Sequence, residues 1–233
     1  MATTQGARRG NLGVLTGALF AIAWVAGSFA QDWTADKPDI AYPRPTDGMA
    51  NVQKWFEANG DAAALNAGLQ IIGGIALLVF AGVIAKLLIT VNRTSSAGSV
   101  AGLAGALSAG MLLIGAAGQA GLGTDAASDG ATAQALYQLT FWTGGPLHVA
   151  ALGLMVAAVA TGLGAVLPKW LKISGQVVGG LAMLATLSGV SEIFVAFTLF
   201  GRYLSFVWLL IVTITMAVKR SAPASAPAAE ARA

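Results

Sequence analysis

The sequence is poor in cysteine, histidine and charge. Its 233 residues include no cysteine, which excludes disulfides, thiolate metal sites and iron–sulfur clusters. A single histidine excludes a bis-histidine haem and a three-histidine zinc site within one chain. Charged residues make up 10% of the chain, whereas a soluble domain carries about a quarter. We therefore expect no metal and no cofactor, and the composition argues against a water-soluble globule.

The remaining composition is strongly apolar, with 56% hydrophobic residues and a mean hydropathy of +0.73. About 20 mostly apolar residues in helical form cross a bilayer core about 30 Å thick. Six runs have this length, at about 12–30, 62–88, 99–122, 146–167, 171–190 and 200–218. Lipid offers no partner for backbone polar groups, so each run is predicted to be a helix. The predicted fold class is all-α, a polytopic membrane protein in which residues 1–220 form a bundle of six transmembrane helices.

Turn-forming residues mark the ends of these runs. Asn59-Gly60-Asp61 predicts a turn and a helix N-cap before the second run. Residues 92–96 separate the second run from the third. Pro168 separates the fourth from the fifth, because proline disfavours helix at the preceding residue. Residues 31–60 are predicted to form one outer loop. The Pro/Ala-rich segment 221–233 has no apolar face to bury and is predicted to be a disordered cytoplasmic tail.

The segment 131–142 allows two interpretations. It carries apolar and aromatic residues, among them Tyr137 and Trp142, and Gly144-Gly145-Pro146 follows it. It forms either an interfacial helix on the outer leaflet or the kinked beginning of the fourth run. The sequence leaves both open.

The distribution of charge predicts the orientation, because cytoplasmic segments of membrane proteins are enriched in lysine and arginine. With the N-terminus inside, nine of the 13 basic residues fall on the cytoplasmic side: Arg8, Arg9, Lys86, Arg93, Lys169, Lys172, Lys219, Arg220 and Arg232. The outer side holds Lys37, Arg44, Lys54 and Arg202, together with every acidic residue except Glu230. We predict that both termini are cytoplasmic. The pI near 9.5 then reflects topology, and we expect no nucleic-acid partner.

A second interpretation takes residues 1–30 as a cleaved signal peptide. Arg8-Arg9, the apolar run and Ser28-Phe29-Ala30 match its three-part pattern. Cleavage would leave five spans and an outer N-terminus. The run 12–30 is long for a signal-peptide core, which favours a retained first span.

Six polar residues form the candidate ligand-binding set: Asn66, Gln70, Gln119, His148, Glu192 and Arg202. In the predicted orientation all six lie in the outer half of the membrane or at its outer surface. Ionisable groups at membrane depth are costly and usually face a bundle interior or an aqueous cavity. We hypothesise a polar vestibule open to the outside, in which Glu192 and Arg202 form an ion pair and His148 is titratable. The alternative is that these groups hydrogen-bond between helices or are hydrated at the interface.

Spaced glycines predict close helix packing. Gly98-x-x-x-Gly102 and Gly175-x-x-x-Gly179 are pairs of small residues one helical turn apart, which let helix backbones approach in lipid. The same glycine faces would serve a second hypothesis, in which the chain packs against a larger membrane complex.

Catalytic signatures are weak. A protease similar to the rhomboids would use Ser188 and His148, but the serine precedes the histidine in that family and follows it here. No phosphate-binding loop and no carboxylate–histidine cluster for a di-iron site are present. We do not expect an enzyme.

Several short motifs occur together along the chain: Arg8-Arg9-Gly10, Asn59-Gly60-Asp61, Leu167-Pro168-Lys169 followed by Gly175 and Gly179, and Trp208-Leu209-Leu210. Through them, residues 8–219 resemble a family of bacterial six-span membrane proteins that is defined as a domain of unknown function. The resemblance implies the six-span architecture and a bacterial cytoplasmic membrane, and it implies no reaction. Arg202 departs from the acidic residue expected in that family, so no site is carried over to it.

Two functions are therefore expected as alternatives. In the first, the chain binds or transports a small molecule or lipid through an outward-facing polar cavity. In the second, it is a non-catalytic accessory subunit. The expected partners are membrane lipids, a small-molecule ligand, and either further copies of the chain or a membrane complex.

Overall fold

The computed structural model describes residues 3–44 and 47–221, except for the side chains of residues 3–12, 14, 217 and 219–221. This part of the chain is helical and contains no strand. The long helices are α1 (Thr3–Thr34), α3 (Gly60–Val91), α4 (Ala97–Leu122), α6 (His148–Gly162), α7 (Lys169–Met183) and α8 (Val195–Ser221). The shorter ones are α2 (Met49–Ala58), η1 (Asp125–Ser128), α5 (Gly130–Trp142), η2 (Thr143–Leu147), η3 (Leu184–Gly189) and η4 (Glu192–Phe194). Apart from Ser221, the tail predicted over residues 221–233 lies outside the described residues.

Five helical runs in the described residues are long and apolar enough to cross a membrane. They are Gly60–Val91, Ala97–Leu122, Gly130–Gly162, Lys169–Gly189 and Glu192–Met216. These runs overlap the second to sixth predicted spans. The first predicted span, 12–30, lies within α1, several of whose side chains are not described. The all-α prediction is confirmed for the described residues, and the count of six spans stays a prediction.

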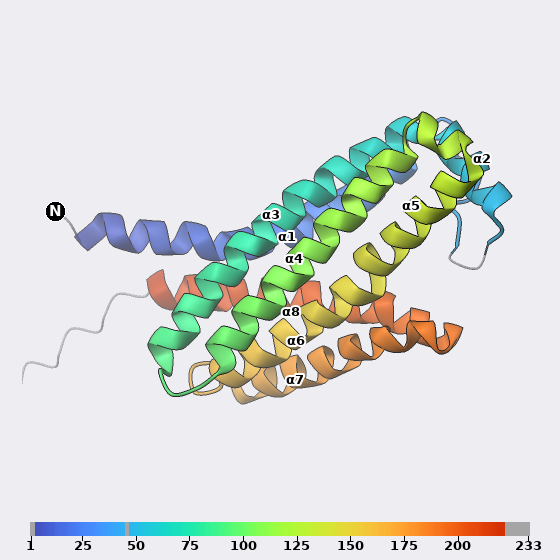
Figure 1. The fold of residues 1–233 in the computed structure, drawn as a ribbon. Coiled ribbons are helices and arrows are strands. Elements are labelled where there is room, and N and C mark those ends of the chain that lie inside the picture. Colours follow the sequence, from blue (N-terminus) through green and yellow to red (C-terminus); the bar gives the residue numbers. More distant parts are fainter. Residues whose placement is uncertain (1–2, 45–46, 222–233) are drawn as a thin grey trace, which may run out of the picture.

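The helices pack as a bundle in which α3 lies between α1 and α4, and α6 lies between α4 and α7 (Figure 1). Helix α8 closes the bundle against α1, α6 and α7. The main core contains Phe20 of α1, Phe80 of α3, Leu112 of α4 and Met155 of α6, all fully buried. Helix α1 is therefore part of the core and not an appendage to it.

The predicted breaks between helices are confirmed. Helix α3 ends at Val91 and α4 begins at Ala97, which matches the turn predicted over residues 92–96. Pro168 stands at the N-cap of α7, after α6 has ended at Gly162. The turn at Asn59-Gly60-Asp61 is also present, and Asn59 is the N-cap residue of α3 as predicted, but without a side-chain cap. The Asn59 side chain makes no capping hydrogen bond, because its Oδ1 accepts one from the Lys37 backbone N–H at 2.8 Å.

The segment predicted as an outer loop, 31–60, contains a helix that the sequence analysis did not predict. Helix α1 extends to Thr34, and α2 occupies Met49–Ala58. Val52, Trp55 and Phe56 of α2 are buried in a small core of their own beneath the loop. Their spacing of three and four residues is helical, but one short apolar stripe in a polar segment does not reach the length of a span.

Helix α5 continues directly into η2 and α6. The 33-residue run Gly130–Gly162 is interrupted only by a π-helical turn containing Pro146, where Gly145 leaves helical geometry with φ −107° and ψ −107°. Proline lacks a backbone N–H and so frees a carbonyl of the preceding turn, a common cause of a kink. Of the two interpretations left open for residues 131–142, the structure has the kinked continuation.

Small residues bring helix backbones together at the crossing of α6 and α7. A Cβ atom on Gly179 would lie 2.6 Å from the carbonyl oxygen of Gly153, and one on Gly175 would lie 2.7 Å from the Cβ of Ala160 in α6. Gly175 also leaves room for the ring of Trp208 from α8. The pair Gly98 and Gly102 similarly faces Ala85 of α3. The prediction that both spaced glycine pairs serve close packing is confirmed.

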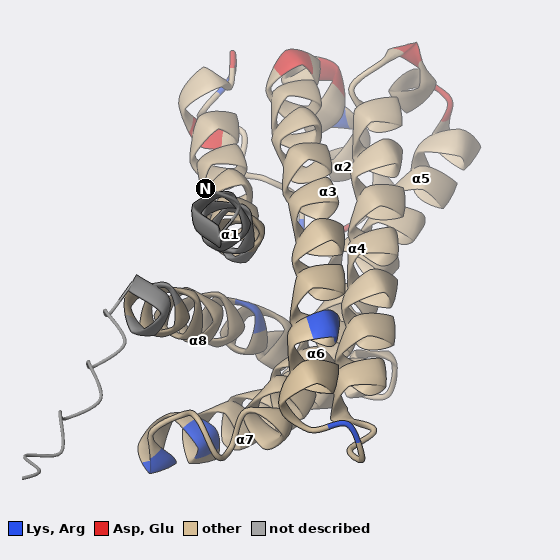
Figure 2. Cartoon of the chain, turned by 90° about the vertical axis from the view of Figure 1, so that its left-hand side faces the viewer, with Lys and Arg blue, Asp and Glu red and all other residues tan. Residues whose placement is uncertain are grey.

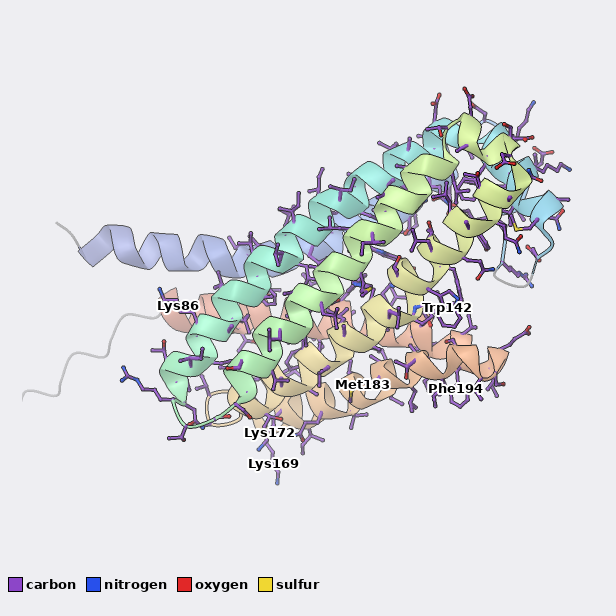
Figure 3. The ribbon with its side chains drawn as sticks, in the orientation of Figure 1. Lys86, Trp142, Lys169, Lys172, Met183 and Phe194 are labelled. Carbon is purple, nitrogen blue, oxygen red and sulfur yellow. The ribbon has the colours of Figure 1, made fainter. Side chains whose placement is uncertain are left out.

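Charge is distributed between the two ends of the bundle. Figure 2 shows acidic residues gathered at the end where α3 begins, whereas the lysines of α7 lie at the opposite end. The side chains of Lys169 and Lys172 project away from the bundle at the start of α7 (Figure 3). The α3–α4 turn, which carries Arg93, is at this same end, because Gly162 at the end of α6 packs on Leu88 and Ala97.

Replacing Gly179 by leucine tests the close crossing of α6 and α7. The larger side chain would meet the α6 backbone, so we expect the free energy of unfolding to fall by about 1–3 kcal/mol. The matched control is Gly180→Leu on the next position of α7, where a Cβ atom meets nothing within 4 Å. Unfolding is measured in mixed detergent micelles. Equal loss of stability in both variants would contradict this packing.

Candidate polar cavity

A cavity of about 480 Å³ lies toward the acidic end of the bundle. Its walls come from α1, α3, α4, α5, η2 and α8, and the loop segment 42–44 also borders it. Cavities of roughly 300–1,000 Å³ that combine an apolar lining with a few polar groups are typical ligand sites. Four of the six sequence-predicted residues line it: Asn66, Gln70, Gln119 and Arg202.

Four buried amide side chains form a closed ring of hydrogen bonds beside the cavity. Gln31 Oε1 accepts from Asn66 Nδ2 and, at 2.9 Å, from Gln119 Nε2. Gln70 Nε2 donates to Asn66 Oδ1 at 3.1 Å and to Gln119 Oε1 at 3.2 Å. The ring joins α1, α3 and α4. It realises the alternative of hydrogen bonding between helices, and its residues also line the cavity.

The ring leaves two polar atoms available to a ligand. Gln31 Nε2 and Gln70 Oε1 have no hydrogen-bond partner among the described residues, and both side chains line the cavity. One is a donor and the other an acceptor. The cavity thus offers both kinds of hydrogen bond at fixed positions.

Arg202 lies deeper in α8 than the sequence predicts. The helical run begins at Glu192, so Arg202 is well inside the candidate span Glu192–Met216 and its side chain is 8% exposed. Its Nη2 donates to the carbonyl oxygen of Gly144 in the π-helical turn. Its guanidinium lies 4.7 Å from the ring centroid of Trp24, a cation–π contact with α1. Arg202 therefore ties α8 to η2 and α1.

The predicted ion pair between Glu192 and Arg202 is absent from the described residues. Glu192 is exposed at the start of η4 and does not line the cavity, and the guanidinium of Arg202 is directed to Gly144 and Trp24 instead. The opposite charges of Glu192 and Arg202 suggest an ion pair in the sequence. In the structure, the extended backbone of Ser191 and the short η4 helix place Glu192 outside the bundle.

His148 also lies away from the cavity. It is fully buried, and its Nδ1 lies 2.9 Å from Ser108 Oγ and 3.0 Å from the Ser108 carbonyl oxygen. Ser108 Oγ donates back to the His148 carbonyl oxygen at 3.0 Å. These contacts join α4 to α6 in the core. The hypothesis of a titratable histidine in the vestibule is therefore wrong, and the serine near His148 is Ser108 and not Ser188.

Several residues that line the cavity are not among those predicted from the sequence. Trp24, Ser28 and Gln31 follow one another at helical spacing and present one face of α1 to it. Thr198 precedes Arg202 by one turn on α8. Gln31 was overlooked because a polar residue at the end of an apolar run resembles ordinary interfacial placement, yet its shared face with Ser28 was a usable signal.

The loop over the cavity is attached to the bundle at several points. Tyr137 of α5 donates a hydrogen bond to the carbonyl oxygen of Pro43 at 3.2 Å. The ring of Tyr42 packs edge-on against Trp55, with ring centroids 4.8 Å apart. In the described part of the chain, no three histidine, cysteine or carboxylate residues come together as a metal site. The described residues of the cavity therefore offer a ligand hydrogen-bonding groups and the buried cation of Arg202.

Comparison of the chain with protein-family models, with curated proteins and with solved structures finds no match. The resemblance to a six-span bacterial family therefore stays a prediction. The site has to be interpreted from its own geometry and charge.

Replacing Gln119 by leucine tests the amide ring. It removes one donor and one acceptor, so Gln31 and Gln70 each lose a partner, and we expect a loss of about 1 kcal/mol of stability, as for hydrogen bonds between membrane helices. The control is Gln134→Leu at an exposed position of α5, where the change should stay below about 0.5 kcal/mol. Thermal unfolding in detergent measures both. A Gln119 variant as stable as its control would refute a structural role for the ring.

Proposed function

We propose that the chain is a membrane protein of six spans that binds or transports a small molecule or lipid through this cavity. The observation that carries the proposal is the cavity itself. It lies within a bundle of membrane-length helices, and it gathers an amide donor, an amide acceptor and an arginine from helices distant in sequence. Polar groups of this kind are costly at membrane depth and mark ligand or ion paths.

We further propose that the protein resides in the bacterial cytoplasmic membrane with both termini in the cytoplasm. The separation of charge between the two ends of the bundle supports this orientation, since basic residues are retained inside (Figure 2). The cavity then opens toward the outer side, beneath the loop that carries Tyr42 and Arg44. The span added to the five candidate runs is the first predicted one, within α1, which packs on α3 and α8.

The alternative of an accessory subunit has less support. It relied on glycine faces available to another protein, but Gly98, Gly102, Gly175 and Gly179 pack against other helices of this chain. A partner would have to use other surfaces. Stoichiometric co-purification of a second chain remains the result that would favour this alternative.

Single cysteines test the orientation, since the native chain has none. Ser128→Cys and Ser96→Cys are exposed, near-isosteric changes at the acidic and basic ends, respectively. In right-side-out vesicles, a membrane-impermeant maleimide should label Ser128→Cys at once and Ser96→Cys only after permeabilisation. The reverse order would invert the proposed topology.

A cavity-filling variant tests the binding function. Ser28→Trp places a large ring in the cavity, whereas Ala26→Trp puts the same ring on the exposed face of α1. Untargeted mass spectrometry should find a compound in extracts of the purified native chain and of purified Ala26→Trp. The same compound should be at least tenfold less abundant in extracts of Ser28→Trp. Identical extracts from all three proteins would contradict the proposal.

A further inference from the structure

The cavity contains a buried cation that has no counter-ion among the described residues. Arg202 is more than nine-tenths buried, and it forms no ion pair with any described carboxylate. Its Nη2 donates to the Gly144 carbonyl, but within the described part of the chain its Nε has no hydrogen-bond partner. Buried charges in proteins are normally paired, because removing a charge from water without a partner is unfavourable. The guanidinium is planar and presents several donors, a geometry suited to carboxylate and phosphate groups.

A second unpartnered group lies on the same face of α8. Thr198 lines the cavity one turn before Arg202 and is 5% exposed, and its Oγ1 finds no hydrogen-bond partner in the residues that the structure describes. Residues four apart on a helix are neighbours on its surface, so the hydroxyl and the guanidinium face the same space. Thr198 can donate one hydrogen bond to an oxygen that also contacts Arg202.

The other charges bordering the cavity do not neutralise Arg202. Asp32 and Arg44 also line it, but both side chains are exposed at the outer end, and their charges offset each other. Solvent screens exposed charges far more than buried ones. The buried part of the cavity therefore carries the net positive charge of Arg202.

Part of the remaining lining is apolar and extends to the outer surface of the bundle. Trp24, Phe141, Val195 and Leu199 contribute to the walls, and Leu199 is 53% exposed on the outside of the bundle. Leu199 borders the cavity and is also exposed beside the apolar, exposed Phe200. This arrangement marks an opening toward the lipid chains. The cavity thus combines a cationic, hydrogen-bonding end with an apolar side.

We propose that the cavity binds an anionic amphiphile, with its acidic oxygens on Arg202 and Thr198 and its hydrocarbon chain against Trp24, Phe141 and Leu199. This inference rests on the proposed function and names the class of its ligand. The head is a carboxylate or a phosphate ester, supplied either by a free fatty acid or by a membrane phospholipid. Gln31 Nε2 and Gln70 Oε1 are the further hydrogen-bonding groups of the same cavity.

Dodecanoate and dodecanol have hydrocarbon chains of the same length and differ in the charge of the head group. Their binding to the purified, delipidated full chain therefore isolates the effect of that charge. Equilibrium dialysis with radiolabelled probes in a neutral detergent should show that the acid binds at least tenfold more tightly than the alcohol. Arg202→Gln, which removes the charge and keeps a polar side chain, should remove this preference, and Arg202→Lys should keep most of it. Thr198→Val, which breaks no internal hydrogen bond, should weaken dodecanoate about threefold and leave dodecanol unchanged.

Competition identifies the source of the anionic head. Displacement of dodecanoate by phosphatidylglycerol in mixed micelles, but not by phosphatidylcholine, assigns the site to an anionic phospholipid, and displacement by neither assigns it to a free fatty acid. Both results support the inference. Chromatographic homogeneity and the Tm of each variant show that it is folded.

The inference and the function on which it rests fail in different ways. Equal affinity for acid and alcohol, unchanged in Arg202→Gln and lost in Ser28→Trp, would overturn the anionic ligand and leave a binding cavity. Binding of neither probe, together with identical extracts from native chain and Ser28→Trp, would overturn both.

Discussion

In a lipid-embedded helix bundle, each buried polar group has to find its partner inside the protein, and this constraint shapes the cavity. Water is not available at membrane depth to replace a missing hydrogen bond. The four amides of Gln31, Asn66, Gln70 and Gln119 meet the constraint by bonding to one another in a ring. Arg202 meets it only in part, through the carbonyl of Gly144 and the ring of Trp24.

The rest of the architecture brings these groups together. Pro146 interrupts the run Gly130–Gly162, and the π-helical turn there presents the Gly144 carbonyl to Arg202. Gly115 of α4 permits this geometry, because a Cβ on it would lie 2.7 Å from the Gly144 backbone. Irregular backbone at membrane depth is tolerated where it is buried in protein or lines a cavity. The kink, the glycine contact and the arginine thus belong to one arrangement.

Local sequence features predicted much of the fold. Apolar runs, Pro168 and residues 92–96 depend on composition and chain geometry over short distances. Helices α3 and α4 begin and end within three residues of the predicted runs, whereas α1 begins earlier, at Thr3, and α7 ends earlier, at Met183. The candidate site was predicted only in part. Four of the predicted residues line one cavity: Asn66, Gln70, Gln119 and Arg202. They could be identified from the sequence because a polar residue inside an apolar run is costly and usually has a role.

What the sequence could not provide was the rotation of each helix. A polar residue in a span faces either the cavity or the core, and His148 faces Ser108 of α4 because of how α4 and α6 pack. The position of Glu192 depended on the irregular backbone before α8, which no periodic pattern reveals. Helix α2 was missed because a helix of ten residues with three buried side chains gives only a weak signal.

We propose an outward-open cavity in which the cation of Arg202 lies beside Thr198 without a counter-ion among the described residues. The most direct measurement is the reaction rate of Thr198→Cys, in the otherwise cysteine-free chain, with an anionic and a cationic methanethiosulfonate reagent of similar size applied from outside. Both reagents should react. The ratio of the anionic rate to the cationic rate should be at least tenfold higher at Thr198→Cys than at an exposed cysteine, Ser128→Cys. No reaction with either reagent, or preference for the cationic one, would contradict the proposal.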